Sequence, residues 1–247
     1  MTLNYEVMAG WSHLNDERVR KLASRGNRGF SIVWPNILWV AEQFWQAQSN
    51  GAVEERLETW HHLVMSVGNF KRQGGTQICL LEAVPAGKSL AASENRPESC
   101  RVQLMSGGVV LQRDEPATWA RLNEVKGLGL ATATTLLSAL WPGTHAIMDR
   151  RDLNAAIALS FAETVNQGCV DPGSRKGIQV SWNRYQWLRE KLLAKTAELS
   201  VADQEIRLVD VERALYALDR RVERVKAQPT YSWSEYAEAL DLVLLAM

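Results

Sequence analysis

The sequence contains few cysteines and no excess of charge of either sign, and both shortages exclude classes of protein. The three cysteines are Cys79, Cys100 and Cys169, and they form no C-x-x-C pair. This spacing argues against a zinc ribbon, an iron–sulfur cluster and a disulfide scaffold. Lysine plus arginine and aspartate plus glutamate number 28 each, so no overall field attracts nucleic acid or a membrane surface. Any affinity for nucleic acid must come from local patches and oriented backbone groups.

Long hydrophobic runs are also lacking. No apolar stretch reaches the ~18 residues of a membrane-spanning helix, and the start, MTLNYEVMAGWSHLNDERVRK, has no basic-then-apolar signal peptide. We therefore expect a soluble, cytoplasmic, monomeric protein that contacts no membrane. The 247 residues, of which 46% are hydrophobic, suffice for one compact core or for two lobes that share a cleft.

Most of the chain has helical spacing of its apolar residues, so the sequence predicts a mainly α fold. Pro35 is expected to interrupt an early helix, which then begins at Asn36. The segment 76–113 differs, because TQICLLEAV resembles a strand and RVQLMSGGVVLQ a hairpin. A small β insertion there is left open. The expected helices span residues 16–24, 36–48, 53–67, 118–125, 130–141, 150–163, 185–199, 201–227 and 232–247.

Two glycines one residue apart, Gly127 and Gly129, precede the helix expected from Leu130, in the sequence VKGLGLATA. Glycine costs roughly 0.5–1 kcal/mol in ordinary helix or strand, so the pair indicates a backbone that approaches another group closely. Without Cβ atoms, the turn can lie against a phosphate, which the N–H groups opening the helix then face at the positive end of its dipole. The alternative is a tight turn between two core helices.

This helix–VKGLGLATA–helix pattern, followed by the apolar segment HAIM and Asp149, resembles the helix-hairpin-helix superfamily of DNA glycosylases. Within it, the chain is most similar to the bacterial 8-oxoguanine-glycosylase-like group. The resemblance covers residues 119–159 and implies a two-lobed helical fold with double-stranded DNA as the partner. The chain would then consist of an N-terminal helical region (1–115), a segment with the hairpin and the catalytic helix (116–165), and C-terminal helices (166–247).

The resemblance also implies which residues contact DNA and which one is catalytic. Asp149 stands where the family has its essential carboxylate. Aspartate is also a preferred helix N-cap, and Asp152 completes a good helix start, so capping is the alternative role; the two roles are compatible. His145 is expected at the surface, either against DNA or merely between helices. The implied DNA contacts are Lys126, Gly127, Leu128, Gly129, Leu130, Ala131, Arg150 and Arg151.

One departure from the family concerns the reaction type. Bifunctional members have a lysine two residues after the second hairpin glycine, where it forms a Schiff base with the sugar. Here that position is Ala131, so the chain resembles a monofunctional enzyme that leaves an abasic site. The resemblance implies no required cofactor and no metal centre, and at most a structural monovalent cation at the hairpin carbonyls.

A glycosylase must turn its target base out of the duplex into a pocket with aromatic or apolar walls. Most of the ten tryptophans are expected in core packing, but some aromatic residues could line such a pocket. The candidates are Phe30, Trp34, Trp39, Tyr185 and Trp187. The base itself is left open between oxidised or alkylated bases and modified bases of phage genomes.

Two other functions remain open from the sequence. The hairpin could grip phosphate in a DNA-binding protein without catalysis. Alternatively, Gly127 and Gly129 could simply make a turn in a helical interaction protein. Formation of abasic sites that depends on Asp149 would distinguish a glycosylase from a DNA-binding protein without catalysis. Salt-sensitive DNA binding that depends on the two glycines would exclude the helical interaction protein.

Overall fold

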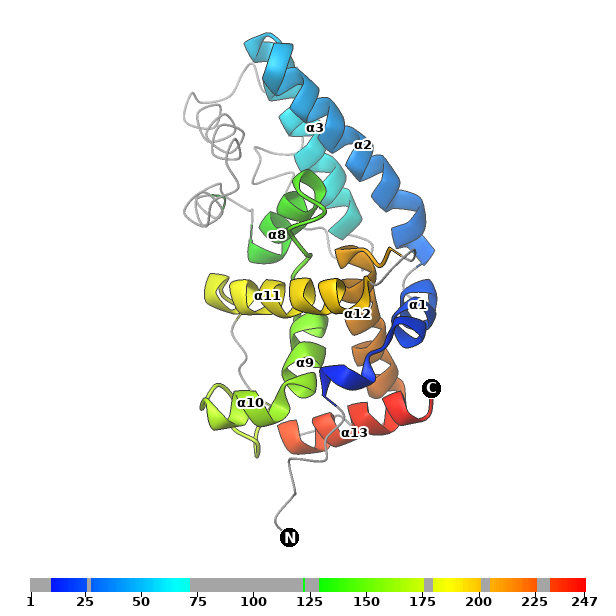
Figure 1. Ribbon diagram of the computed structural model, residues 1–247. Coiled ribbons are helices and arrows are strands. Elements are labelled where there is room, and N and C mark those ends of the chain that lie inside the picture. Colours follow the sequence, from blue (N-terminus) through cyan, green and yellow to red (C-terminus); the bar gives the residue numbers. More distant parts are fainter. Residues whose placement is uncertain are drawn as a thin grey trace. The chain divides into compact units, whose positions relative to one another are not determined.

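The computed structural model describes residues 10–25, 28–71, 122, 129–175, 180–200, 205–225 and 232–247, and the regular elements within these ranges are helices (Figure 1). The prediction of a mainly α fold is confirmed for this part of the chain. The expected β insertion at 76–113 and nearly all of the expected helix 118–125 lie outside the described residues. In chain order the elements are η2 (Trp11–His13), α1 (Asp16–Arg25), α2 (Arg28–Asn50), α3 (Val53–Lys71), α8 (Leu130–Leu140), α9 (Arg150–Leu159), α10 (Phe161–Asn166), α11 (Trp182–Leu199), α12 (Leu208–Val225) and α13 (Trp233–Leu245).

The chain divides into two compact units. One comprises residues 1–28 together with 148–247, and the other comprises residues 29–147. The division falls inside the expected segment 116–165, between the helix that follows the glycine pair and the helix that follows Asp149.

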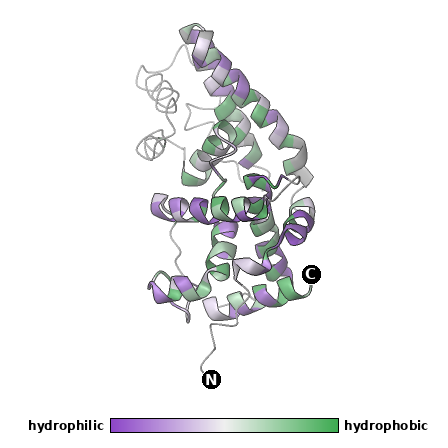
Figure 2. Cartoon of the chain, viewed as in Figure 1, coloured by the Kyte–Doolittle hydropathy of each residue, from purple (hydrophilic) through white to green (hydrophobic). Residues whose placement is uncertain are grey.

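In the first unit, α12 is the central helix and packs against α1, α9, α11 and α13. Its apolar residues recur at alternating spacings of three and four, which gives the helix one hydrophobic face. Hydrophobic and hydrophilic residues accordingly separate along the helices (Figure 2). The buried residues of this stripe are Leu208, Val211, Leu215, Leu218 and Val222.

The helix α12 begins later than its expected start at residue 201. The carboxylate of Asp210 accepts a hydrogen bond from the backbone N–H of Arg207 at 3.2 Å, which caps the helix start. Ile206, directly before this cap, is buried. The buried side chain and the cap together fix where the helix can begin.

The single helix expected over 150–163 is divided into α9 and α10 at Ser160. Ser160 leaves helical geometry (φ −106°, ψ 24°), and its hydroxyl accepts a hydrogen bond from the indole N–H of Trp11 at 2.7 Å. After α10, Gly168 adopts a positive φ of 66°, and its N–H donates to the carbonyl of Val165 at 2.9 Å. This left-handed residue ends the helix.

The second unit contains α2, α3 and α8. Phe44 of α2 packs against Trp60 of α3, with ring centroids 5.6 Å apart. The indole N–H of Trp45 donates to the carbonyl of Leu140 at 3.3 Å, and its ring lies 5.4 Å from that of Trp141. Aromatic side chains of α2 therefore contact both α3 and the end of α8.

The predicted break at Pro35 is wrong, because Pro35 lies inside α2. An interior proline removes one helical hydrogen bond and crowds the preceding turn, at a cost of ~3 kcal/mol or more. Aromatic side chains pack against one another beside this turn. Phe30 stacks on Trp34 at 5.1 Å between ring centroids, and Phe70 of α3 lies 5.6 Å from Phe30 and 5.8 Å from Trp34.

Candidate functional site

Asp149 is the N-cap residue of α9, as its capping role predicts. Its backbone is extended (φ −107°, ψ 156°). Its Oδ1 accepts a hydrogen bond from the backbone N–H of Arg151 at 3.0 Å, and its own N–H donates to Oδ2 of Asp152 at 3.0 Å. This reciprocal capping box holds a half-buried carboxylate at the positive end of a helix.

The HAIM segment before Asp149 is buried throughout. His145 is 1% exposed and Met148 is fully buried, so the expected surface position of His145 is wrong. The backbone N–H of His145 donates to the carbonyl of Trp141 at 2.9 Å, and the two rings lie 5.8 Å apart. These contacts place His145 in the packing at the end of the unit 29–147, whereas Asp149 belongs to the other unit and is held there by its capping contacts.

A buried carboxylate that the sequence did not single out anchors α9. Asp219 of α12 is fully buried. Its Oδ2 accepts from Nη1 of Arg151 at 2.7 Å, and its Oδ1 accepts from the hydroxyl of Tyr236 at 2.5 Å, from Nδ2 of Asn154 at 3.4 Å and from Nη2 of Arg175 at 3.5 Å. Burial raises the pKa of Asp219, although the hydrogen bond from Tyr236 and the two arginines act in the opposite direction. Asp219 therefore joins α9, α12, α13 and the segment before α11.

Arg151, an expected DNA contact, is bound to carboxylates in this structure. Besides Asp219, its Nη1 contacts Oε2 of Glu223 at 2.7 Å. Burial lowers the pKa of Arg151, but the hydrogen bonds and charges of Glu223 and Asp219 outweigh it and raise that pKa. A phosphate would have to compete with Glu223 for this guanidinium. Arg150, the first residue of α9, is exposed and forms no ion pair within the described part of the chain.

The helix that follows the glycine pair, α8, begins without a side-chain cap. Gly129 is its N-cap residue, with φ −64° and ψ 163°, and the first turn contains no acidic residue. A Cβ at Gly129 would meet no atom of the described residues within 4 Å, and both Gly129 and Ala131 are exposed. Neither the φ of Gly129 nor any described neighbour therefore requires a glycine here. The other expected hairpin contacts, Lys126, Gly127 and Leu128, lie outside the described residues.

The aromatic residues expected around a flipped base have different surroundings. Phe30 and Trp34 are buried in the cluster with Phe70, and Tyr185 is fully buried beside Trp182. The structure gives these three candidates a packing role. Trp187 is half-buried.

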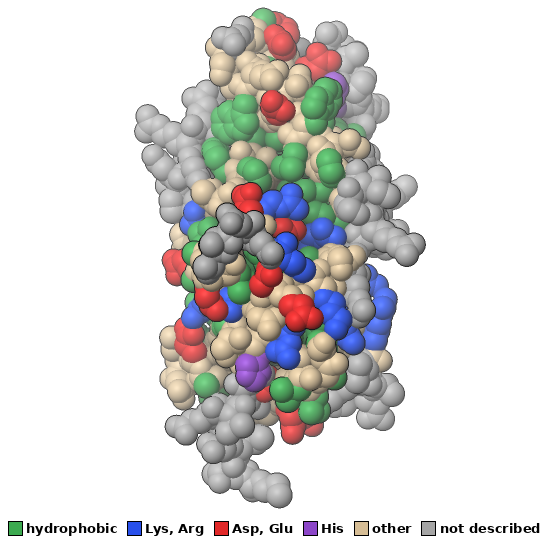
Figure 3. Space-filling model, turned by 45° about the vertical axis from the view of Figure 1, so that its right-hand side comes forward, with side chains coloured by type: hydrophobic (Ala, Val, Ile, Leu, Met, Phe, Trp, Pro, Cys, Tyr) green, Lys and Arg blue, Asp and Glu red, His purple; other side chains and the backbone are tan. Residues whose placement is uncertain are grey.

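Trp39 differs from the other candidates because it is 61% exposed on α2. Figure 3 shows apolar side chains gathered on the surface of the upper part of the molecule. Within the described residues, Trp39 is therefore the aromatic candidate that is most accessible to a partner.

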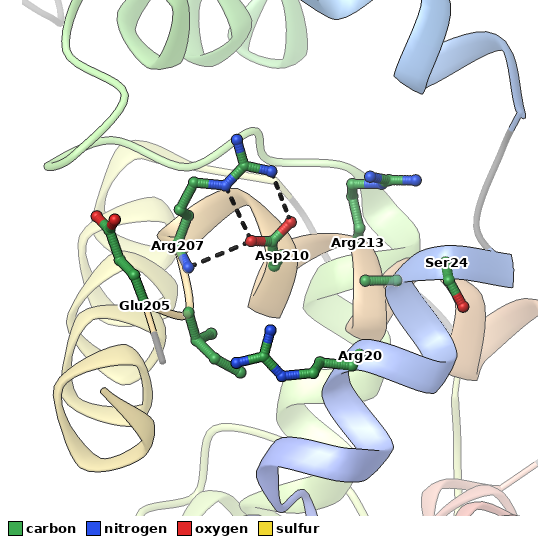
Figure 4. A pocket seen from close by; sticks show the side chains of 8 residues that line it. Arg20, Ser24, Glu205, Arg207, Asp210 and Arg213 are labelled. Carbon is green, nitrogen blue, oxygen red and sulfur yellow. Dashed lines mark hydrogen bonds and ion pairs between the residues drawn. The ribbon is translucent and has the colours of Figure 1, made fainter. Parts of the chain in front are cut away.

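A separate pocket of about 420 Å³ lies between α1 and the start of α12 (Figure 4). It contains three arginines, but carboxylates balance them. Asp210 binds Nε of Arg207 at 3.0 Å and Nη2 at 3.1 Å, and Asp16 binds Nε of Arg20 at 2.9 Å. Burial lowers the pKa of Arg213, the third arginine, although Asp210 and Glu212 act against this. Basic and acidic side chains likewise alternate on the surface of this unit (Figure 3).

The described residues contain no group of three histidine, cysteine, aspartate or glutamate side chains placed to hold a metal ion. None of the described helices combines the length and the apolar character needed to cross a membrane. No protein-family model matches the chain, and comparisons with curated proteins and with solved structures likewise found no match.

Proposed function

We propose that this protein is a monofunctional DNA glycosylase that hydrolyses the N-glycosidic bond of a damaged or modified base. The observation that carries the proposal is the placement of Asp149. Its half-buried carboxylate is held by the backbone N–H of Arg151 at 3.0 Å, directly after a buried segment and at the start of an anchored helix.

The chemistry needs a fixed negative charge beside the sugar. As the bond to the base breaks, positive charge builds on the sugar, as in glycoside hydrolysis. A preorganised carboxylate stabilises this charge and can orient the attacking water. In the proposed reaction, the oxygen of water bonds to the anomeric carbon as the bond to the base breaks. The electrons of that bond leave with the base, which gains the proton that the water loses, and an abasic site remains. Ala131 offers no amine for a Schiff base, which supports hydrolysis without strand cleavage.

The start of α8 supports DNA as the partner. Within the described part of the chain, no side chain caps the N–H groups of its first turn, and no atom occupies the space where a Cβ of Gly129 would lie. Both features suit close approach of a phosphate to the backbone at the positive end of a helix.

The finer parts of the proposal rest on the resemblance of the sequence. They are a two-lobed glycosylase-like fold, a cytoplasmic monomer, and no required cofactor beyond a structural monovalent cation at the hairpin carbonyls. The substrate class comprises oxidised or alkylated bases and modified bases of phage DNA. A DNA-binding protein without catalysis is the alternative that the following experiment separates.

The decisive experiment is a panel of duplexes with different modified bases, including natural phage DNAs, scored for alkali-labile sites. We expect one class of base to be released by the wild-type protein. Asp149→Asn, which keeps a good N-cap, should lower single-turnover base release by ~10²–10³. Base release at the wild-type rate by a folded Asp149→Asn variant would refute the mechanism. DNA binding without release from any member of the panel would favour the non-catalytic alternative.

A further inference from the structure

Arg151 and Arg175 present their guanidinium groups to one exposed carboxylate. Glu223 contacts Nη1 of Arg151 at 2.7 Å and Nη2 of Arg175 at 3.9 Å. The side chain of Glu223 is 44% exposed, whereas those of Arg151 and Arg175 are 34% and 16% exposed. Two arginines thus hold an anion at the edge of the protein, and that anion is a side chain of the protein itself.

The two arginines are fixed from the buried side, independently of Glu223. Asp219 binds Arg151 at 2.7 Å and Arg175 at 3.5 Å and is itself fully buried. The guanidinium of Arg175 also lies 3.8 Å from the ring centroid of Tyr236. These contacts position both guanidinium groups before any ligand arrives, which lowers the cost of ordering them on binding.

The contact to Glu223 is the replaceable part of this arrangement. Ion pairs between partly exposed side chains contribute little stability and are screened by salt. Glu223 lies on the last turns of α12, and loss of its carboxylate leaves the buried contacts of Asp219 in place. A second anion can therefore take its position at small cost.

The surroundings favour an anion with more than one oxygen. The guanidinium of Arg151 also lies 5.8 Å from the ring centroid of Tyr216. Planar guanidinium groups bind phosphate oxygens in pairs. One phosphate group would replace the negative charge and the acceptor oxygens that Glu223 presents to the two arginines.

We propose that Arg151 and Arg175 form a binding site for a phosphate group, which Glu223 occupies in the free protein. The ligand is a phosphodiester of DNA, so its source rests on the function proposed above, whereas the recognition of phosphate does not. Glu223 acts as an internal competitor: DNA displaces it, and its charge lowers the affinity for every phosphate that enters the site. The competition explains how Arg151 can both pair with carboxylates and contact DNA.

The test compares Glu223→Gln with a matched control, Glu163→Gln. Glu163 forms an ion pair with a single lysine, at 2.6 Å to Lys191, and its side chain is 38% exposed, so both variants lose one negative charge from a partly exposed ion pair. Affinity for inorganic phosphate is measured by NMR of the arginine Nε–H signals, and affinity for duplex DNA by a binding isotherm at fixed ionic strength. We expect Glu223→Gln to bind both ligands roughly 3- to 10-fold more tightly than the control.

The possible outcomes separate this proposal from the proposed function. Equal affinities of the two variants for phosphate would overturn the phosphate site, even if Asp149-dependent base release were observed. Tighter phosphate binding by Glu223→Gln, with no DNA binding by any variant, would support the site and contradict DNA as its ligand. A thermal melt of each variant shows that the comparison is made on folded protein. Adding Arg151→Gln to Glu223→Gln should abolish the gain; a gain that persists would place the phosphate elsewhere.

Discussion

The backbone N–H of Arg151 donates to Oδ1 of Asp149 at 3.0 Å, while the side chain of Arg151 is bound to Asp219 at 2.7 Å. One residue therefore connects the proposed catalytic carboxylate to the buried anchor of α9. This arrangement means that the position of Asp149 depends on α12 and α13 as well as on its own helix. The capping contact and the proposed chemistry can be separated by substitution.

The capping role of Asp149 predicts a pattern of stability that differs from the pattern of activity. Asp149→Ala removes the cap and should lower the free energy of unfolding by about 1 kcal/mol, whereas Asp149→Asn should change it by a few tenths at most. The single-turnover rate of base release should fall strongly in both variants. Urea unfolding and single-turnover assays measure the two effects. Equal stability of both variants would show that the hydrogen bond to Arg151 contributes nothing to α9.

Asp219 shows what the sequence could reveal about the site and what it could not. Its position beside Leu218, on the apolar face of α12, is a signal, because a charged residue on a buried stripe needs partners. The partners come from a loop and from other helices, as Arg175, Arg151 and Tyr236 show. Spacing along the sequence does not indicate such contacts. The capping box of Asp149 could be predicted because both of its members are local.

The aromatic residues illustrate a second limit. Residue type does not distinguish an aromatic ring in the core from one that lines a pocket. The sequence therefore allowed both roles for Phe30 and Trp34. Their spacing of four residues would have indicated one helix face, but the expected break at Pro35 excluded that helix. Phe70 of α3 completes the cluster beside Pro35, and only the folded chain brings it close to Phe30 and Trp34.

Pro35 should limit the stability of α2. It is exposed, so Pro35→Ala changes no core contact, restores a helical N–H and relieves crowding of the preceding turn. The greater freedom of the unfolded chain opposes this gain. We expect a net increase of about 1–2 kcal/mol in the free energy of unfolding, measured by urea denaturation. A loss of stability would show that the proline ring itself supports the cluster of Phe30, Trp34 and Phe70.

Gly129 should matter for binding and not for folding. Gly129→Ser adds a Cβ into open space and supplies a good N-cap, so stability should hold or rise. The same Cβ stands between the backbone and a phosphate, so DNA affinity should fall by roughly 1–3 kcal/mol, whatever the DNA sequence. A bulky residue at Gly127 should act in the same direction. Unchanged affinity in a folded Gly129→Ser variant would contradict the assignment of the hairpin.

The absence of a lysine at Ala131 predicts the products of the reaction. Borohydride should trap no covalent adduct between protein and DNA, and strands should break only after alkali or heat. The matched variant is Ala131→Lys, whose side chain starts at an exposed position in the first turn of α8. Denaturing gel electrophoresis detects the covalent adduct after borohydride treatment, and the same method with and without alkali measures strand cleavage. An adduct with the wild-type protein would show that another amine attacks the sugar.

Asp219 should give the folding stability a dependence on pH that a substitution removes. Burial raises its pKa, and the charge of Glu223 adds to this, while Tyr236, Arg151 and Arg175 act against both. The folded chain thus holds this proton more tightly than the unfolded chain does. The resulting stability is complete below the unfolded pKa of about 3.9 and is lost as the pH rises through the folded pKa.

The side chain of Asn cannot lose a proton in this range, so comparison with Asp219→Asn isolates the contribution of Asp219 to the pH dependence of the free energy of unfolding. We expect the free energy of unfolding of the wild-type protein, minus that of the variant, to decrease from about pH 4 towards pH 7, by about 1.4 kcal/mol for each unit of the pKa shift. Urea unfolding of both proteins across this range provides the measurement. A difference that grows with pH would mean that the ion pairs with Arg151 and Arg175 outweigh burial. In that case the pKa of Asp219 would lie below its unfolded value, and the ion pairs with the two arginines would strengthen the anchor of α9 as the pH rises above that value.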